Sequence, residues 1–352
     1  MIKDMSMKRI AIAGFGFMGR MHYGNWKKIP GVRVVAICDA NLAQFTRVTC
    51  GNLGGADTDT DFTGLAVYDD FGKMLATGGF DAVDITLPTP FHPKMTIAAL
   101  AAGCHVLCEK PMALSVRDCD RMLLAARRAK RTLLVAHCLR FWPEYVALKR
   151  IVDSGRYGQV VAASFRRSTP APDPKGPHGW FLDESKSGGC LLDMHIHDAD
   201  MIRFIFGDPQ DLHVASHRRK DGLLDHVAVS YSYPDKVVTG TVSWAVAKTL
   251  GFEASFHVIL ERATVVFDSK RTVPLEVYPA VGKPFVPKTL SRNAYEAEQR
   301  YFLGLLDRKV DASMLSDHDA RAAVALVSRI AAKCRKLAGA DGQSFNGKNR
   351  KS

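Results

Sequence analysis

The chain has 352 residues, of which 47% are hydrophobic and 24% are charged. This composition is typical of a soluble globular protein, and the length suffices for two domains with separate cores. No apolar run reaches the roughly 18 residues that a membrane-spanning helix needs, so we expect no membrane association. The net charge of +12 is spread over short clusters such as 126–131 and 217–220 rather than gathered in one stripe, so we expect no nucleic-acid partner.

The first third of the chain alternates strand-like and helix-like stretches. Strand-like runs begin at Arg9, Val32, Ala82 and His105, and helical patterns cover 92–103 and 115–131. Strand, helix and strand at this spacing predict right-handed βαβ units and therefore a parallel sheet. The fold class we expect is α/β, with a doubly wound parallel sheet over residues 1–130.

After about residue 150 the pattern changes to strand-like runs with few helices between them. Pro234 and Asp235 separate two such runs, which predicts a hairpin turn. We expect residues 131–340 to form an α+β domain with a large, mostly antiparallel open sheet. Residues 188–206 and 318–339 read as helices, and the polar residues 341–352 as a flexible tail.

A glycine pattern, "GFGFMG", follows the first predicted strand and precedes a helix. Gly14, Gly16 and Gly19 fit the G-x-G-x-x-G signature, in which the glycines permit a tight turn, approach of a pyrophosphate and close helix packing. With Phe17 and Met18 between them, they predict a Rossmann cofactor domain. The helix N-terminus favours the negative phosphates.

Asp39 ends the second predicted strand, 20 residues after Gly19. A carboxylate at this position accepts hydrogen bonds from the adenosine ribose hydroxyls and repels a 2′-phosphate. No arginine directly follows Asp39 to bind such a phosphate. We therefore expect NAD as the cofactor, and NADP as the less favoured alternative.

Five segments resemble, in order, motifs of the glucose–fructose oxidoreductase/inositol dehydrogenase/MocA (Gfo/Idh/MocA) family. They are "GFGFMGRMH" at 14–22, "LPTPFHP" at 87–93, "CEKP" at 108–111, "LRFWPEY" at 139–145 and "SGGCLLDMHIHDAD" at 187–200. The chain departs from the pattern at Cys190, where the family has a third glycine, and this bears on packing more than on chemistry.

The resemblance implies an oxidoreductase that transfers a hydride between nicotinamide and a hydroxyl or carbonyl of a sugar, inositol or related polyol. By motif, Lys110, Asp193 and His197 would be catalytic. The nicotinamide contacts implied in the same way are Leu87, Pro88, Thr89, His92, Glu109 and Lys110.

Hydride transfer from an alcohol also requires a base for the hydroxyl proton and a charge that stabilises the alkoxide. On a helix, Asp193 and His197 share a face, and a histidine titrates near neutral pH. We expect His197 or Lys110 to be the proximate base, both acting on one reacting oxygen, and Asp193 to orient the site. His195 is expected to be structural or at the rim, with Asp198 and Asp200 facing solvent or capping.

Four further side chains are candidates for a sugar pocket: Arg140, Trp142, His178 and Trp180. Aromatic faces suit the apolar side of a sugar ring. The alternative for Arg140 is a structural ion pair, and for the tryptophans it is core or interface packing.

Two other functions are compatible with parts of the sequence. The H-x-H of residues 195–197 binds divalent metal in some hydrolases, but that motif requires a strand, where residues i and i+2 share a face. Here the segment is predicted to be helical, so His195 and His197 would point in different directions, and we expect no metal site. A non-enzymatic NAD-binding regulator would have no need of Lys110, Asp193 and His197.

Assembly and location follow from two further patterns. The alternating run Val237–Ala247 on an open sheet has to be covered, which predicts a homodimer or homotetramer through the C-terminal sheet. The 8 cysteines form no C-x-x-C pair and several lie in apolar stretches, which predicts reduced thiols and a cytoplasmic protein.

Overall fold

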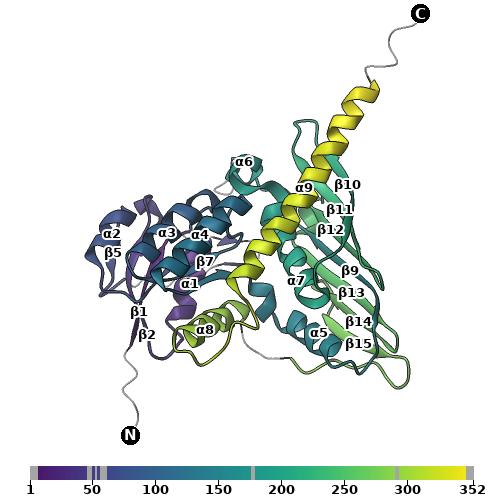
Figure 1. The fold of residues 1–352 in the computed structure, drawn as a ribbon, viewed down its shortest axis with the longest axis horizontal. Coiled ribbons are helices and arrows are strands. Elements are labelled where there is room, and N and C mark those ends of the chain that lie inside the picture. The colour runs from purple at the N-terminus through teal and green to yellow at the C-terminus, as the bar shows by residue number, and fades with distance from the viewer. Residues whose placement is uncertain are drawn as a thin grey trace, which may run out of the picture. The chain divides into compact units, whose positions relative to one another are not determined.

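A computed structural model describes residues 7–45, 50–51, 54–55, 62–175, 179–289 and 293–345. The chain divides into two compact units. The first unit comprises Met1–Pro143 and Leu290–Arg321, and the second comprises Glu144–Thr289 and Ala322–Ser352. Figure 1 labels most of the helices and strands of both units.

The first unit is built on a parallel sheet of six strands in the order β5-β2-β1-β6-β7-β8. Its strands are β1 (Lys8–Ala13), β2 (Val32–Cys38), β5 (Ala66–Tyr68), β6 (Ala82–Ile85), β7 (His105–Glu109) and β8 (Leu133–Ala136). The chain reverses its direction of winding between β1 and β6, as in a doubly wound nucleotide-binding sheet. The prediction of a Rossmann sheet is confirmed.

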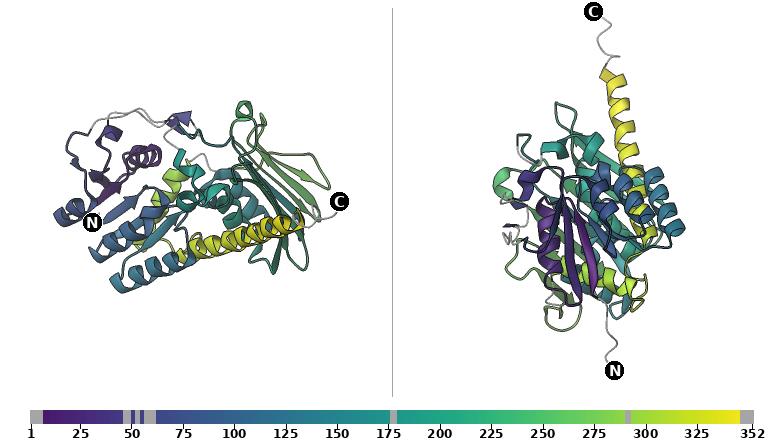
Figure 2. Two further views of the ribbon diagram at one scale, coloured as in Figure 1. Left: turned by 90° about the horizontal axis from the view of Figure 1, so that it is seen from above. Right: turned by 90° about the vertical axis from the view of Figure 1, so that its left-hand side faces the viewer.

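Five helices of the described residues belong to the same unit as this sheet. They are α1 (Phe17–Trp26), α2 (Phe71–Thr77), α3 (His92–Ala101), α4 (Val116–Ala129) and, much later in the chain, α8 (Ala294–Leu306). Helices α3 and α4 lie side by side (Figure 2), and α1 packs against α8. Short 3-10 turns occur at η1 (Leu42–Phe45), η2 (Thr89–Phe91) and η3 (Cys138–Phe141), and β3 (Cys50–Gly51) pairs with β4 (Gly54–Gly55).

The expected domain boundaries need correction. Residues 131–143 belong to the first unit, because β8 is the last strand of its parallel sheet. Residues 290–321 return to the same unit, because α8 buries Phe302 in its core. The helix α9 (Asp317–Phe345) covers the beginning of the expected tail, and residues 346–352 lie outside the described part.

The second unit carries a sheet of seven strands in the order β10-β11-β12-β9-β13-β14-β15. Its strands are β9 (Val160–Ser168), β10 (Asp211–Arg218), β11 (Leu224–Ser232), β12 (Val237–Ser243), β13 (Glu253–Leu260), β14 (Ala263–Asp268) and β15 (Leu275–Pro279). All neighbouring pairs are antiparallel except β12 with β9. The predicted antiparallel sheet and the hairpin at Pro234 are confirmed.

The inner face of this sheet packs against helices. These are α5 (Pro143–Asp153) and α7 (Ile196–Phe206). The unit also contains the short α6 (Glu184–Ser187), 3-10 turns at η4 (Gly179–Leu182) and η6 (Lys248–Leu250), and the π-helical turn η5 (Leu191–His195). The ring of Tyr145 on α5 lies 5.2 Å from that of Phe256, and Phe165 lies 6.2 Å from Phe206 on α7. Figure 2 shows α9 as one continuous helix, in agreement with the predicted amphipathic helix.

The outer face of the sheet differs from the expectation for Val237–Ala247. The strand ends at Ser243, and its apolar residues Val238 and Val242 point into the unit's own core with no exposed surface. The outward residues of the strand are Thr239, Thr241 and the exposed Val237. Within the described residues, no helix is long and apolar enough to cross a membrane.

Candidate active site

The glycine-rich turn between β1 and α1 is closely packed at Gly14 and Gly19 and open at Gly16. A Cβ on Gly19 would lie 2.1 Å from the Gly14 carbonyl oxygen, and one on Gly14 would lie 2.8 Å from the Thr86 carbonyl oxygen. A Cβ on Gly16 would meet no described atom within 4 Å. The first N–H groups of α1 have no acceptor within the helix and face this open space. The turn therefore fits a pyrophosphate.

Asp39 lies directly after β2 and holds this turn in place. One carboxylate oxygen accepts a 2.7 Å hydrogen bond from the Phe15 N–H, and the other accepts one of 2.8 Å from the Asn41 N–H. The side chain remains partly exposed. A carboxylate at the end of the second strand fits the ribose hydroxyls of NAD, whose hydride acceptor ring would then lie on the β6–β8 half of the sheet.

The loop after β6 contains most of the predicted nicotinamide contacts. Leu87 and Pro88 are partly exposed, whereas Thr89 and His92 are buried. The two ring nitrogens of His92 lie 2.7 Å from the Leu87 carbonyl oxygen and 2.9 Å from the Pro111 carbonyl oxygen. In this structure His92 therefore supports the loop from behind, and Leu87 and Pro88 are the residues available to a ligand.

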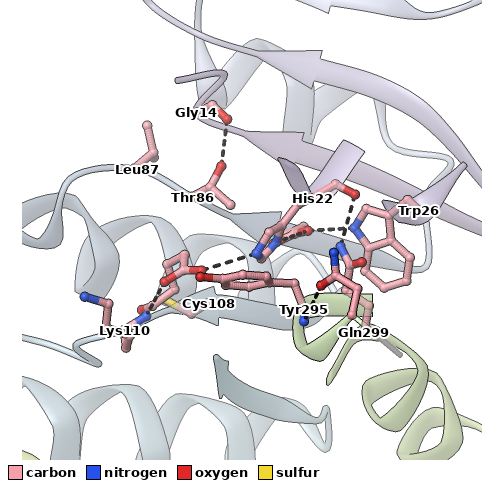
Figure 3. A network of polar contacts seen from close by, with 12 residues as sticks. Gly14, His22, Trp26, Thr86, Leu87, Cys108, Lys110, Tyr295 and Gln299 are labelled. Atoms are coloured by element: carbon pink, nitrogen blue, oxygen red, sulfur yellow. Dashed lines mark hydrogen bonds and ion pairs between the residues drawn. The ribbon is translucent and has the colours of Figure 1, made fainter. Parts of the chain in front are cut away.

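Glu109 and Lys110 stand at the carboxyl end of β7. Glu109 is buried, and one of its oxygens accepts a 3.0 Å hydrogen bond from the Lys110 N–H. Lys110 is partly exposed, and its side chain extends away from the polar network (Figure 3). Ligands of doubly wound sheets bind at the carboxyl ends of the strands, so Lys110 stands where a reacting group would be bound.

Behind Glu109 lies His22, a buried residue of α1. Its Nδ1 is 2.9 Å from an Asp84 oxygen, and its Nε2 is 3.2 Å from a Glu109 oxygen. Trp26 also donates to Asp84, over 2.6 Å (Figure 3). Burial alone lowers the pKa of His22, but the carboxylates of Asp84 and Glu109 raise it well above its ordinary value. The two carboxylates therefore favour the imidazolium form of His22, which donates to Asp84 from Nδ1 and forms an ion pair with Glu109 through Nε2.

Two residues of α8 complete this polar network. The Gln299 side chain donates to the His22 carbonyl oxygen over 3.1 Å. Neither carboxyl oxygen of Glu298 has a hydrogen-bond partner among the described residues, and burial together with Glu109 raises its pKa well above its ordinary value. Glu298 is thus a neutral acid. The sequence analysis missed these roles, although the signal was present in Asp84, a carboxylate inside the buried strand "AVDI".

In the second unit, the expected single helix over 188–206 is interrupted. Gly188 and Gly189 take positive φ angles of 74° and 63°, which end α6. The chain then forms a π-helical turn, Leu191–His195, before α7 begins at Ile196. Such turns occur frequently at functional sites. The thiol of Cys190 donates to the Leu224 carbonyl oxygen over 3.2 Å, which gives this departure a packing role.

Asp193 and His197 are the exposed positions of this segment. From Leu191 to Asp200 only these two side chains are partly exposed, and the others are buried. Both therefore point out of the same side of the helical segment. This is the arrangement that an acid/base pair needs, since a group that exchanges protons with a ligand has to reach it.

His195 is buried on the opposite side of the segment, against the sheet. Its Nε2 lies 2.6 Å from the hydroxyl oxygen of Tyr231, and its Nδ1 has no hydrogen-bond partner within the described residues. Burial lowers the pKa of His195 to about 4. The residue is neutral and supports the structural alternative. His195 and His197 point in different directions, which removes the geometry that H-x-H metal binding requires.

The expectation that Asp198 and Asp200 face solvent or cap the helix is wrong. Their exposures are 1% and 0%. Asp198 receives two hydrogen bonds, of 2.9 and 3.0 Å, from the guanidinium of Arg167 on β9, which also donates to the Tyr145 hydroxyl. The helix packs this side against the sheet because an inward-pointing arginine requires a carboxylate partner.

The four candidates for a sugar pocket lie in different settings. Arg140 is buried, donates to the Met314 carbonyl oxygen and pairs with Asp319 at 3.3 Å, which favours the structural ion pair. Trp142 packs edge-on against Tyr295 at 6.0 Å, and Trp180 stacks on Phe181 at 4.0 Å. Both tryptophans remain partly exposed. His178 lies outside the described residues.

Three features occur together on this doubly wound sheet: the glycine turn, a carboxylate after β2 and a lysine after β7. Together with the second, sheet-bearing unit, they are typical of dinucleotide-dependent oxidoreductases. Comparison with known protein families identifies the family within this class. Residues 8–137 match the oxidoreductase family with an NAD-binding Rossmann fold, and residues 145–266 match the Gfo/Idh/MocA C-terminal domain. The chain belongs to the Gfo/Idh/MocA family of NAD-binding oxidoreductases.

Characterised relatives share part of this chain. It is 35% identical to 1,5-anhydro-D-fructose reductase of Ensifer adhaerens over 47% of the chain and 51% of the relative. It is 32% identical to myo-inositol 2-dehydrogenase of Thermotoga maritima over 57% of the chain and 55% of the relative. The chain thus spans about half the length of the curated relatives it matches.

Solved structures extend the likeness of fold to nearly the whole chain. A levoglucosan dehydrogenase in complex with NADH and levoglucosan has a TM-score of 0.79 at 18% identity, with coverage of 94% of this chain and 97% of that chain. At this identity the likeness establishes the fold.

Proposed function

We propose that the protein is an NAD-dependent oxidoreductase that transfers a hydride between nicotinamide and a hydroxyl or carbonyl of a sugar, inositol or related polyol. The observation that carries this proposal is the partly exposed Lys110 at the carboxyl end of β7, in the half of the sheet assigned to nicotinamide. Relatives named as a fructose-derivative reductase and an inositol dehydrogenase support the substrate class.

The bound cofactor supplies the hydride acceptor or donor, and the side chains supply everything else. When an alcohol is oxidised, its carbinol C–H leaves as a hydride and its O–H leaves as a proton. We assign the proton to His197, whose side chain is partly exposed, and the stabilisation of the alkoxide to the Lys110 ammonium. Asp193, exposed on the same side of its helical segment as His197, orients the substrate hydroxyl.

The test is a panel of sugars, inositols and polyols with NAD, followed by the absorbance of NADH. On the best substrate, His197→Ala lowers turnover about 10²–10⁴-fold, as expected for one acid/base group, and leaves NAD affinity unchanged. Lys110→Ala lowers turnover and also weakens NAD binding. The matched control is His318→Ala, an exposed histidine of α9 that belongs to neither the cofactor contacts nor the acid/base residues and should have no effect.

A His197→Ala variant with full turnover would remove that residue from the mechanism. If NAD binds tightly but no member of the panel is turned over, the non-enzymatic regulator becomes the better interpretation. Turnover that depends on added zinc and is lost with a chelator would instead revive a metal-dependent reaction.

Cofactor preference depends on Asp39. We expect NAD to bind more tightly than NADP, because this carboxylate repels a 2′-phosphate. Asp39→Ser should narrow or reverse the preference in calorimetric titrations of both cofactors. Tighter binding of NADP by the unmodified protein would contradict the assignment.

We further propose a cytoplasmic homodimer or homotetramer that pairs through the outer face of the seven-stranded sheet. That face presents polar side chains in register, with Ser230, Thr239, Ser164 and His257 in one row across four strands. We propose that a second copy covers this row. Light scattering should give an oligomer that Thr239→Arg dissociates, and a monomeric unmodified protein would refute the proposal.

A further inference from the structure

Lys110 is flanked by two residues that are each bound to a different buried histidine. On its N-terminal side, Glu109 pairs with His22 at 3.2 Å and also accepts the Lys110 N–H. On its C-terminal side, the Pro111 carbonyl oxygen lies 2.9 Å from His92 Nδ1. The backbone of Lys110 is therefore fixed from α1 on one side and from α3 on the other.

The two histidines differ in what they contribute. The ring nitrogens of His22 face two carboxylates, Asp84 on β6 and Glu109 on β7, which favour its charged form. His92 faces two backbone carbonyls, and burial lowers its pKa, although those carbonyls and Glu109 oppose the shift and Lys110 adds to it. His22 therefore supplies charge to the end of β7, whereas His92 supplies geometry by linking the loop after β6 to the turn after β7.

Removal of the His22 charge has a definite electrostatic consequence. Lys110 and His92 would then be left to favour the ionised form of Glu109 against its burial. The pKa of Glu109 is now held below its ordinary value, against burial, by His22 first and Lys110 second. Without the imidazolium, burial acts to protonate Glu109, and the Lys110 N–H loses a charged acceptor.

We infer that His22 is a positioning residue for the reacting lysine: it holds the Glu109 carboxylate that accepts the Lys110 N–H, and so keeps Lys110 and the nicotinamide half of the cofactor site in their working geometry. This inference rests on the proposed function, in which Lys110 acts at the reacting centre. His92 is a second positioning residue, whose contribution is independent of charge.

The experiment measures NAD and NADH dissociation constants across pH, without any sugar substrate. In His22→Gln, we expect NAD to bind about tenfold more weakly near pH 6 than near pH 8, because Glu109 becomes protonated at the lower pH. The unmodified protein should change less than about twofold over the same interval. His92→Gln should weaken binding equally at both pH values, because a glutamine amide donates without titrating.

The matched control is His105→Gln. His105 begins the same strand, β7, at the opposite end of the sheet, where its Nδ1 accepts a 3.0 Å hydrogen bond from the Thr132 N–H. This variant tests loss of a histidine from the unit without contact to Glu109. We expect its NAD affinity and pH profile to match those of the unmodified protein.

Glu109→Gln provides the second arm, should His22→Gln fail to fold. It should reproduce the weak binding of His22→Gln near pH 6 at every pH, and the double variant should lose no more than either single variant. A flat pH profile with unchanged affinity in His22→Gln, or losses that simply add in the double variant, would overturn the inference. Absence of NAD binding by the unmodified protein would instead overturn the proposed function.

Discussion

Two buried histidines, one in each unit, are held in opposite charge states. His22 has a pKa well above its ordinary value, and His195 has a pKa of about 4. Both have no exposed surface, so burial disfavours the imidazolium in each. The difference lies in the partners, which are two carboxylates for His22 and one tyrosine hydroxyl for His195.

The carboxylate of Asp198 lies near His195 but does not reverse the downward shift of the His195 pKa. Asp198 raises the pKa of His195, but Arg167, which binds Asp198 through two hydrogen bonds, lowers it. The negative charge is thus already neutralised. A protonated His195 would also bury an Nδ1–H that has no acceptor among the described residues. The comparison teaches that the charge of a buried histidine depends on whether its carboxylate is otherwise paired.

The largest expected change in stability comes from breaking the ion pair between Arg167 and Asp198, which neutralises the carboxylate near His195. Arg167→Met leaves Asp198 buried and unpaired, and should lower the free energy of unfolding at neutral pH by about 3–5 kcal/mol in urea titrations. The loss should shrink at acid pH, because His195 can then take the proton. The control is Arg166→Met, whose side chain is 52% exposed in its pair with Glu253 and should change stability by less than about 1 kcal/mol. Equal losses in both variants would contradict this account.

Acid should destabilise the protein through His195. Its pKa is depressed in the folded state, so the unfolded chain binds the proton more readily between the ordinary value near 6.5 and about 4. Stability should therefore fall by up to roughly 3 kcal/mol as pH decreases across this window. His195→Gln should remove that part of the pH dependence, which urea unfolding at several pH values measures. An unchanged acid slope in this variant would show that His195 is not its source.

The pH dependence of stability that His22 contributes has the opposite sign. A raised pKa in the folded state means that its stabilisation is fully present below about pH 6.5 and is lost as pH rises toward the raised value. The expected loss is about 1.4 kcal/mol for each pH unit in that range. His22→Gln should abolish this alkaline loss while leaving the acid slope of His195 intact. An unmodified protein whose stability does not change above neutral pH would contradict the charged state of His22.

The smallest effect is expected from Tyr231→Phe. The variant removes the only hydrogen-bond partner of His195 among the described residues and should lower stability by about 1 kcal/mol, while keeping the ring packing. Tyr233→Phe is a control, because its hydroxyl donates to the Gly207 carbonyl oxygen away from any histidine. If Tyr231→Phe steepens the acid slope, the hydroxyl rather than burial governs the charge of His195.

Local patterns in the sequence predicted the parts of the molecule that local chemistry determines. The glycine turn, Asp39 and the strand that ends before Lys110 all follow from short spacings, and the structure has them where expected. The separation of four residues likewise placed Asp193 and His197 on one side of a helical segment.

What sequence analysis missed depends on residues distant in the chain. Asp198 is buried because Arg167, 31 residues away, points inward from β9. His22 is charged because of Asp84 and Glu109, which the parallel sheet brings together from 62 and 87 residues further along. A helical pattern reveals which residues share a face, but it does not say whether the opposite face meets water or an arginine.

The discontinuity of the first unit has a consequence for its synthesis. Its sheet is translated by Pro143, but α8, which buries Phe302 and supplies Gln299 to His22, follows only after Leu290. At ordinary translation rates of about 5–20 residues per second, the nascent first unit waits roughly 10–30 seconds for these residues. During that interval all seven strands of the second unit's sheet are synthesised. We therefore expect the first unit to mature only late in synthesis, although its own sheet is made early, and the second unit to be completed after it, because α9 follows α8 in the chain.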